Sequence, residues 1–139
     1  MDKIRIGIVG YGNLGRGVQY ASAQNPDTEV VAVFTRRAPE TVKTVLPVKV
    51  EKYEDMKNYV GKIDVMILCG GSATDLPAQS AEVAKLFNTV DSFDTHAKIP
   101  EYFAALDKSA KDAGHLSAMS IGWDPGLFSL ARIYFGSSL

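Results

Sequence analysis

The chain has 139 residues, and its 15 basic and 16 acidic side chains give a formal net charge of −1. This balance argues against a nucleic-acid partner that binds through bulk charge, and the length fits one domain with a normal core. No apolar run is long enough to cross a bilayer, and a strand pattern follows residue 3 directly, so we expect no membrane association and no signal peptide. The single cysteine, Cys69, excludes an internal disulfide bond and a multi-cysteine zinc site. We therefore expect a cytoplasmic protein that holds no metal.

The first predicted strand, residues 4–9, ends in a glycine-rich turn that a helix over residues 13–24 follows. Gly10 allows a tight turn, Gly12 lets the backbone approach a pyrophosphate, and Gly15 lets the helix pack closely on the strand. The free N–H groups and the positive dipole end of the helix would then face the phosphates. This context predicts a dinucleotide site, and the alternative is a glycine-rich turn that binds no ligand.

Strands and helices alternate along the rest of the chain. Further strands are expected at 29–34, 48–50, 63–69, 88–91 and 116–121, and further helices at 53–59, 77–86, 101–113 and 127–135. In the first helix, Leu14, Val18 and Ala21 recur at helical spacing, which predicts that they form its buried face. The order of elements predicts an α/β fold over residues 1–139, a Rossmann-type doubly wound parallel sheet of about six strands with helices on both faces.

Thr35, Arg36 and Arg37 end the second strand, about twenty residues past the glycines. At this position an NAD-binding domain usually carries an acid for the ribose 2′-hydroxyl, whereas two arginines would attract a 2′-phosphate. Charge-assisted hydrogen bonds contribute roughly 1.5–3 kcal/mol each, so one net contact would favour NADP over NAD by roughly tenfold to a hundredfold. The alternative is a solvated arginine pair on a loop.

Parallel strands place the loops at their carboxyl ends on one edge of the sheet. Asp94 and Asp124 stand out there, because either could hold a substrate ammonium or take its proton. Hydride loss from an amine carbon requires the neutral amine, so a nearby carboxylate acting as general base makes chemical sense. The alternative for Asp124 is a helix cap, with Pro125 at the first helical position. Cys69, which ends the 63–69 strand without an obvious base, is expected to be a packed residue rather than a nucleophile.

Other residues of these loops have two interpretations. Trp123, the only tryptophan, either walls a nicotinamide or substrate pocket or fills space under a loop. Asp91 is expected to cap or orient its turn. His96 and His115 are separated by a helix and share no metal spacing, so we expect His96 to be a turn residue rather than a ligand and His115 to be a surface or turn residue.

Five segments, in their order and spacing, resemble the meso-diaminopimelate dehydrogenase family, and the resemblance covers essentially the whole chain. The segments are residues 8–16, 34–37, 68–75, 90–96 and 122–126. The resemblance implies a reversible, NADP-dependent oxidative deamination at the D-centre of meso-2,6-diaminopimelate, in diaminopimelate and lysine biosynthesis. By the family pattern, Asp94 and Asp124 lie at the reacting amino group, with Trp123 beside the substrate.

The same pattern implies a continuous path for NADP. The pyrophosphate turn comprises Gly10, Tyr11, Gly12, Asn13, Leu14 and Gly15, and the 2′-phosphate site comprises Thr35, Arg36 and Arg37. The rest of the path comprises Cys69, Gly70, Gly71, Ser72, Ser92, Phe93, Asp94, Ile121, Gly122, Trp123, Asp124 and Pro125.

Members of this family are more than twice as long as this chain. The additional part should carry the homodimer interface and most contacts to the distal L-centre and both carboxylates of the substrate. We therefore expect this chain alone to bind NADP without useful turnover. Apolar residues near its end, such as Leu130, Ile133, Tyr134 and Phe135, are then expected to be exposed where a second domain packs.

Two rival functions share the same fold. One is another NADP-dependent reductase of amino-acid biosynthesis, such as a dihydrodipicolinate reductase, and the other is a non-catalytic NADP sensor. Fold alone does not decide between them.

Overall fold

The computed structural model describes residues 2–137. The strands are β1 (Ile4–Val9), β2 (Thr28–Thr35), β3 (Lys49–Lys52), β4 (Val65–Leu68), β5 (Asn88–Asp91) and β6 (Ser117–Ala118). The α-helices are α1 (Asn13–Gln24), α2 (Leu76–Val83), α3 (Ile99–Ala113) and α4 (Leu127–Ser137). Short 3-10 helices are η1 (Pro39–Thr41), η2 (Tyr53–Tyr59) and η3 (His96–Lys98). Among the helices described, none combines the length and the apolar character that crossing a membrane requires.

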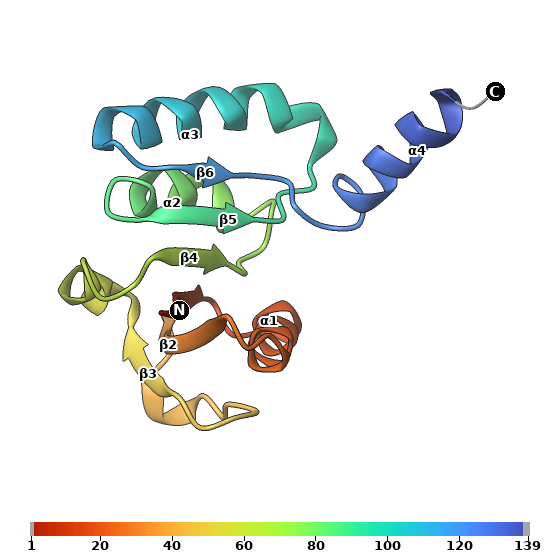
Figure 1. Ribbon diagram of the computed structural model, residues 1–139. Helices are drawn as coiled ribbons and strands as arrows, with labels where there is room; N and C mark the ends of the chain where they lie inside the picture. The colour runs from red at the N-terminus through yellow and green to blue at the C-terminus, as the bar shows by residue number, and fades with distance from the viewer. Residues whose placement is uncertain (1, 138–139) are drawn as a thin grey trace.

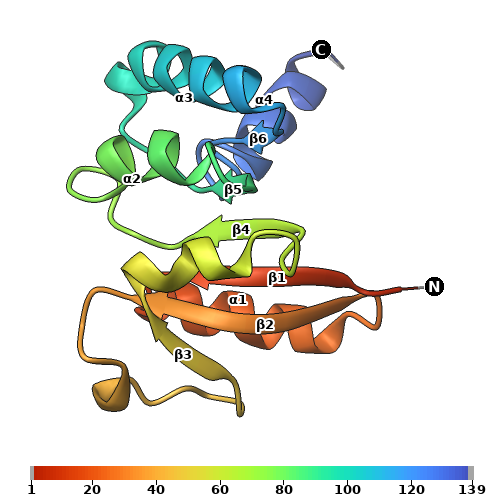
Figure 2. The same ribbon diagram turned by 90° about the vertical axis from the view of Figure 1, so that its left-hand side faces the viewer.

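The strands form one sheet in the order β3-β2-β1-β4-β5-β6, and every pair is parallel (Figure 2). The chain starts at the centre with β1, moves outward to β3, and then returns to β4 on the other side of β1. The strand order therefore reverses between β1 and β4, which is where doubly wound sheets bind their ligands. The predicted fold class, an α/β doubly wound parallel sheet of six strands, is confirmed.

Side chains from alternate strand positions build a core on each face of the sheet. On one face, Ile6 and Ile8 of β1 cluster with Val18 of α1. On the other face, Phe34 and Met66 belong to a larger cluster that includes residues of η2, α2 and α3. Figure 2 shows α1 behind the sheet and η2 in front of it. The predicted helices on both faces are thus confirmed.

The predicted buried face of α1 is wrong by one position. Leu14 is 45% exposed, Ala21 is exposed and Val18 is only half-buried. The buried side comprises Gly15, Gln19 and Ser22. A Cβ at Gly15 would lie 2.5 Å from the carbonyl oxygen of Gly10, so the helix rests directly on the turn at this glycine. Close backbone packing, rather than an apolar stripe, therefore sets the orientation of α1.

The last strand is shorter than the predicted 116–121. Only Ser117 and Ala118 pair with β5, because the chain turns away at Ser120, whose φ is +59°. The N–H of Ser120 donates to the carboxylate of Asp91 at 3.1 Å instead of continuing the backbone ladder. β4 is also trimmed, from the predicted 63–69 to 65–68.

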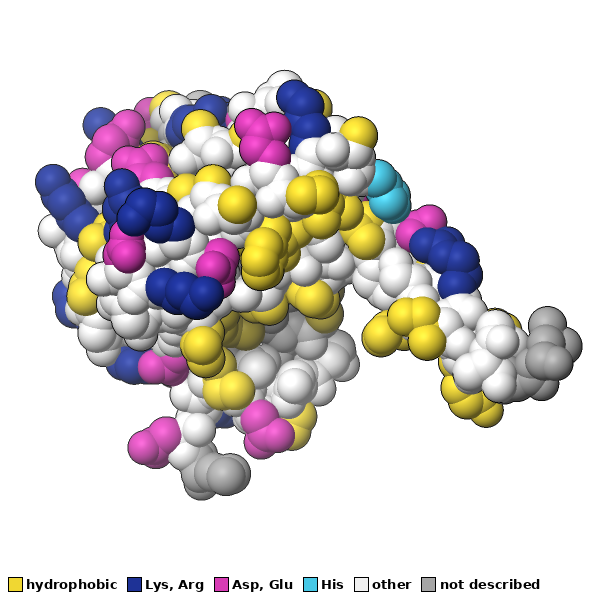
Figure 3. All heavy atoms as spheres, turned by 90° about the horizontal axis from the view of Figure 1, so that it is seen from above, with side chains coloured by type: hydrophobic (Ala, Val, Ile, Leu, Met, Phe, Trp, Pro, Cys, Tyr) yellow, Lys and Arg dark blue, Asp and Glu magenta, His cyan; other side chains and the backbone are white. Residues whose placement is uncertain are grey.

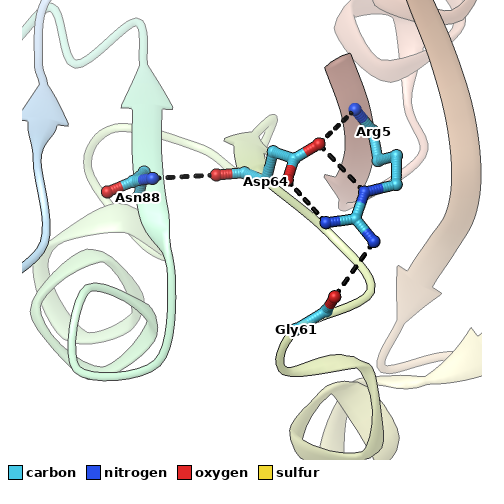
Figure 4. Close-up of polar contacts among 4 residues, drawn as sticks. All are labelled: Arg5, Gly61, Asp64 and Asn88. Carbon is cyan, nitrogen blue, oxygen red and sulfur yellow. Dashed lines mark hydrogen bonds and ion pairs between the residues drawn. The ribbon is translucent and has the colours of Figure 1, made fainter. Parts of the chain in front are cut away.

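The amino end of the sheet is tied by Arg5 and Asp64 (Figure 4). Arg5 donates from its backbone N and Nε to Oδ2 of Asp64, at 2.8 and 3.0 Å, and from Nη2 to Oδ1 at 2.7 Å. Arg5 Nη1 also donates to the carbonyl of Gly61, and Asn88 Nδ2 donates to the carbonyl of Asp64. The hydrogen bonds from Arg5 lower the pKa of Asp64 to about 2. This cluster joins β1, the start of β4 and β5 at the edge opposite the candidate site.

Candidate functional site

The predicted strand-end loops meet at the carboxyl edge of the sheet, as expected for parallel strands. The N–H of Gly10 donates to the carbonyl of Phe34 at 2.9 Å, which joins the loops after β1 and β2. The N–H of Asp94 donates to Oγ of Ser72 at 3.2 Å, which joins the loops after β4 and β5. The N–H of Ile121 donates to the carbonyl of Asp91 at 2.8 Å, which joins the loops after β5 and β6.

The glycine turn has the shape of a phosphate cradle. Gly10 has a φ of +85°, which favours glycine, and a Cβ at Gly12 would meet no atom within 4 Å. The start of α1 has no side-chain cap and no acidic residue in its first turn. Its first N–H groups and its positive dipole end therefore remain available to an anion. The turn fits the pyrophosphate of a dinucleotide.

Tyr11 offers this turn only its backbone. Its ring is 4% exposed, and its hydroxyl donates to Oε1 of Gln19 and accepts from the N–H of Val45 at 2.9 Å. Gln19 in turn donates to the carbonyl of Leu46 at 3.0 Å. The Tyr11 side chain thus fixes the 45–46 segment against α1 and is not available to a ligand at the glycine turn.

Both arginines after β2 have partners near the glycine turn. Arg37 donates from Nη2 to the carbonyl of Tyr11 at 3.0 Å, and its N–H donates to Oγ1 of Thr35 at 3.1 Å. Arg36 pairs through Nη2 with Oδ1 of Asp75 and keeps 60% of its side chain exposed. The pKa of Asp75 is lowered, first by the N–H of Gly71 at 3.0 Å and then by Arg36. Each arginine therefore has a partner on a neighbouring loop, and both residues remain exposed to solvent.

An open cavity of about 520 Å³ lies beside the start of α1. Its lining comprises Leu14, Ser92, Asp94, Ile121, Gly122, Trp123, Asp124, Pro125 and Leu127. All of these except Leu127 are among the predicted site residues. The volume falls in the range of roughly 300–1,000 Å³ that is typical of small-molecule sites. The exposure of Leu14 has a reason here, because its side chain borders the cavity.

Asp124 is held by a cation from α4. Arg132 donates from Nη2 to Oδ1 at 2.6 Å and from Nη1 to Oδ2 at 3.3 Å, and His96 Nε2 lies 3.7 Å from Oδ1. The hydrogen bonds from Arg132 are the main reason why the pKa of Asp124 is lowered. Arg132 and His96 were not predicted as partners, because they approach from different elements and no sequence spacing links them.

The helix-cap interpretation of Asp124 is wrong. The start of α4 is satisfied by carbonyls of the preceding turn, since the N–H of Leu127 donates to Gly122 at 3.0 Å and that of Phe128 to Trp123 at 2.7 Å. The Asp124 carboxylate, in contrast, accepts from Arg132. It is therefore a charged group on the cavity wall.

Asp94 and Trp123 complete that wall. Asp94 is exposed, and within residues 2–137 no hydrogen bond reaches its carboxylate. Trp123 is 69% exposed, and its ring lies 5.6 Å from that of Phe128. The indole thus borders open space, in agreement with a pocket wall and not with a residue that fills space under a loop.

Other predicted residues contribute mainly backbone. Cys69 packs against the cluster that contains Ile6 and Ile8, in agreement with the packed-residue interpretation, and burial raises the pKa of its thiol to about 12. The ring of Phe93 is 1% exposed and stacks on Tyr102, so only its backbone can reach a cofactor. A Cβ at Gly70 would lie 2.7 Å from Cβ of Asp75, so the loop is closely packed at this glycine. His115 contacts the carbonyl of Ala84 through Nδ1 at 2.8 Å, as a turn residue.

Comparisons with known proteins agree with this geometry. A family model described as "Oxidoreductase family, NAD-binding Rossmann fold" matches residues 4–89. Meso-diaminopimelate D-dehydrogenase of Ureibacillus thermosphaericus is 62% identical over 133 residues, which cover 96% of this chain and 41% of that protein. The enzyme of the same name from Corynebacterium glutamicum is 42% identical over 139 residues, which cover 100% of this chain and 42% of that protein.

Matches to solved structures agree with these matches in sequence. The C. glutamicum DAP dehydrogenase in complex with DAP matches with a TM-score of 0.90 at 42% identity, covering 100% of this chain and 42% of that one. An engineered D-amino acid dehydrogenase bound to NADP+ matches with a TM-score of 0.90 at 42% identity, covering 99% and 42%. The chain thus spans about two fifths of the length of the proteins it matches.

Proposed function

Because the chain belongs to the oxidoreductase family with an NAD-binding Rossmann fold, we propose that it is the cofactor-binding part of an NADP-dependent meso-diaminopimelate D-dehydrogenase. The observation that carries the proposal is the arrangement of the carboxyl edge. Arg36 and Arg37 lie at one side of the glycine turn, and Asp94 and Asp124 line the cavity beside α1. An extended ligand with a phosphorylated ribose at one end and a reactive ring at the other would meet the arginines with its phosphate and the carboxylates with its ring.

The cofactor in this proposal is NADP rather than NAD. Two guanidinium groups at the end of β2 attract a 2′-phosphate, and residues 35–37 include no acid that could bind a ribose hydroxyl. Arg37 is fixed to the glycine turn, so little further ordering is needed when a phosphate arrives. A relative solved with NADP+ at 42% identity supports the same choice.

The residues of the chain hold the cofactor and orient its reactive end. Backbone N–H groups at the start of α1 bind the pyrophosphate, and Gly12 leaves room for it. Leu14, Trp123 and Pro125 give the cavity apolar walls that exclude water from a ring. The chemistry that NADP supplies when bound is acceptance of a hydride from the amine-bearing carbon, or its return in the reductive direction.

The two carboxylates take different roles in this proposal. Arg132 lowers the pKa of Asp124, which makes Asp124 a weak base but a lasting anion that can hold the substrate ammonium. Within residues 2–137 no cation pairs with Asp94. We therefore assign Asp94 as the group that accepts the proton that must leave the ammonium before hydride transfer. The resulting imine hydrolyses to a ketone and ammonia.

The substrate and the assembly belong to the longer protein. We propose meso-2,6-diaminopimelate as its substrate, the cytoplasm as its location and a homodimer as its form, in accord with the named relatives' activity and the family pattern. This chain, as one cofactor-binding domain over residues 1–139, is proposed to bind NADP without useful turnover. The exposed apolar residues of α4 would then pack against the substrate-binding part.

A chimera tests the activity. Residues 1–139 are joined to the remaining part of the Ureibacillus relative, whose matched region is 62% identical. We expect reduction of NADP+ that depends on meso-diaminopimelate and no reduction with the L,L isomer. Oxidation of NADPH that depends on dihydrodipicolinate would instead favour a reductase. NADP binding with neither activity would favour a sensor and contradict the dehydrogenase.

A further inference from the structure

Asp91 is a buried carboxylate at the end of β5, between the loops that carry Asp94 and Asp124, and it is 2% exposed. Its Oδ1 accepts from the N–H of Phe93 at 3.0 Å and from the N–H of Ser120 at 3.1 Å. One oxygen atom therefore binds the backbone of both loops at once.

The other oxygen of Asp91 is anchored to helices. The hydroxyl of Tyr102 on α3 donates to Oδ2 at 2.5 Å and also contacts Oγ of Ser80 on α2. The ring of Phe93 stacks on Tyr102 with centroids 3.9 Å apart and planes 4° apart. Two packed helices thus fix the position of the carboxylate, and the carboxylate in turn fixes the backbone of the two loops.

The loop after β6 depends on this contact. Ser120 has a φ of +59°, a conformation that is unfavourable for a residue with a side chain and persists only where its surroundings hold it. The N–H of Ile121 donates to the carbonyl of Asp91, and a Cβ at Gly122 would lie 3.5 Å from Cβ of Ser92. The two loops therefore touch directly at the edge of the cavity.

We propose that Asp91 is a positioning residue, which sets the separation of the Asp94 and Asp124 loops around the nicotinamide end of the cofactor. The inference rests on the proposed function, in that it takes the cavity to receive the nicotinamide. Asp91 itself is buried and is not among the residues that line the cavity.

The test uses this chain and two ligands. NADP+ spans the whole edge, whereas adenosine 2′,5′-bisphosphate carries the 2′-phosphate but no nicotinamide. Trp123 is the only tryptophan, so its fluorescence reports on the 122–126 turn. In Asp91→Ala we expect NADP+ affinity to fall about tenfold, the equivalent of one lost positioning contact, while bisphosphate affinity stays the same. The change of Trp123 emission on NADP+ binding should also shrink.

Two further variants separate positioning from stability. Asp91→Asn keeps an accepting oxygen for both N–H groups, so its NADP+ affinity should stay within about threefold of the parent chain's. Tyr102→Phe keeps the ring stack and both N–H contacts but removes the hydroxyl that fixes Oδ2 of Asp91, so it should lower the ratio of NADP+ to bisphosphate affinity in the same direction as Asp91→Ala but by a smaller factor.

An unchanged affinity ratio in a folded Asp91→Ala chain would overturn the inference. Should that variant not fold, Asp91→Ser is used in its place, and failure of both to fold would make Asp91 a structural residue and overturn the positioning role. Failure of the proposed function has a different signature, because the parent chain would then not bind NADP+ at all.

Discussion

At the scale of single residues, the charges at the carboxyl edge are distinguished by their partners. Arg37 is bound to the glycine turn and Arg36 to Asp75, while Asp124 is bound to Arg132. Partnered charges such as these lose little conformational entropy when a ligand arrives, so a modest number of contacts can give strong selectivity. Each pair leads to a measurable expectation.

The first prediction concerns cofactor choice. Replacing both arginines, Arg36→Ala with Arg37→Ala, should weaken NADP+ binding roughly tenfold to a hundredfold and change NAD+ binding much less, because only NADP+ carries a 2′-phosphate. Calorimetry on both cofactors measures the effect. The matched control removes two cations from α3, Lys108→Ala with Lys111→Ala, and should leave both affinities unchanged. Equal losses for the two cofactors would show that the arginines do not recognise the phosphate.

The second prediction separates the two carboxylates in the chimera. Asp94→Asn should lower kcat by about 10²-fold or more, since it removes the proposed proton acceptor. Asp124→Asn should chiefly raise the KM for meso-diaminopimelate, since it removes the anion that we propose holds the ammonium. NADP+ binding should survive both changes. The exposed Asp112 on α3 supplies the control, as Asp112→Asn, and the assignment is wrong if the kcat and KM effects are exchanged.

At the scale of elements, the turn between β1 and α1 combines close packing with open space. A Cβ would collide with the Gly10 carbonyl at Gly15, but would meet nothing within 4 Å at Gly12 or Gly17. Gly12 directly precedes α1 and Gly15 and Gly17 lie in its first turns, yet the three glycines differ in their surroundings. They therefore separate what the turn does for the fold from what it does for a ligand.

The third prediction follows from that difference. Gly12→Ala should leave the melting temperature nearly unchanged but weaken NADP+ binding by about tenfold or more, because the methyl group occupies the approach of the pyrophosphate. Gly15→Ala should lower both stability and affinity. Gly17→Ala should leave binding intact and raise stability by about 0.5–1 kcal/mol through helix propensity. Normal NADP+ affinity in Gly12→Ala would argue against a phosphate at this turn.

The fourth prediction concerns the opposite edge of the sheet. The pKa of Asp64 is lowered from 3.8 to about 2, so its pairing with Arg5 stabilises the fold above about pH 4, and this stabilisation is lost as the pH falls towards 2. Because 43% of the Asp64 side chain is exposed, solvent screening limits the contribution to about 1 kcal/mol. Urea unfolding should show Asp64→Asn less stable at neutral pH and equal to the parent chain near pH 2. A difference that stays constant down to that pH would exclude this ionisation as its source.

The elements themselves were largely predictable, because β-branched runs and glycine or proline stops are local signals. The order of strands and the gathering of the loops at one edge followed from parallel pairing. The orientation of α1 was not predictable from its apolar spacing, because backbone contact at Gly15 overrides it. The early end of β6 depends on Ser120 donating to Asp91, a contact between residues 29 positions apart. Likewise, no local pattern joins Asp124 to Arg132 and His96.

At the scale of the whole molecule, α4 projects away from the sheet (Figure 1) and Figure 3 shows hydrophobic side chains along it. Leu130 and Ile133 are 67% and 70% exposed, and Phe135 is 65% exposed, which confirms the predicted exposure of this end. Contiguous apolar surface of this kind marks an interaction site. The chain spans about two fifths of the length of its matched relatives, and we propose this surface as the place where the substrate-binding part packs.

The loops at the carboxyl edge line an open cavity beside α1, and α4 leaves apolar side chains exposed. Cofactor selectivity, unlike turnover, should be a property of this chain alone. The fifth prediction is accordingly made for the unmodified chain, and it tests the central claim most directly. Calorimetric titration with NADP+ and NAD+ should give a 1:1 complex with NADP+ that is at least about tenfold tighter than that with NAD+. Equal affinities, or no binding of NADP+, would contradict the account.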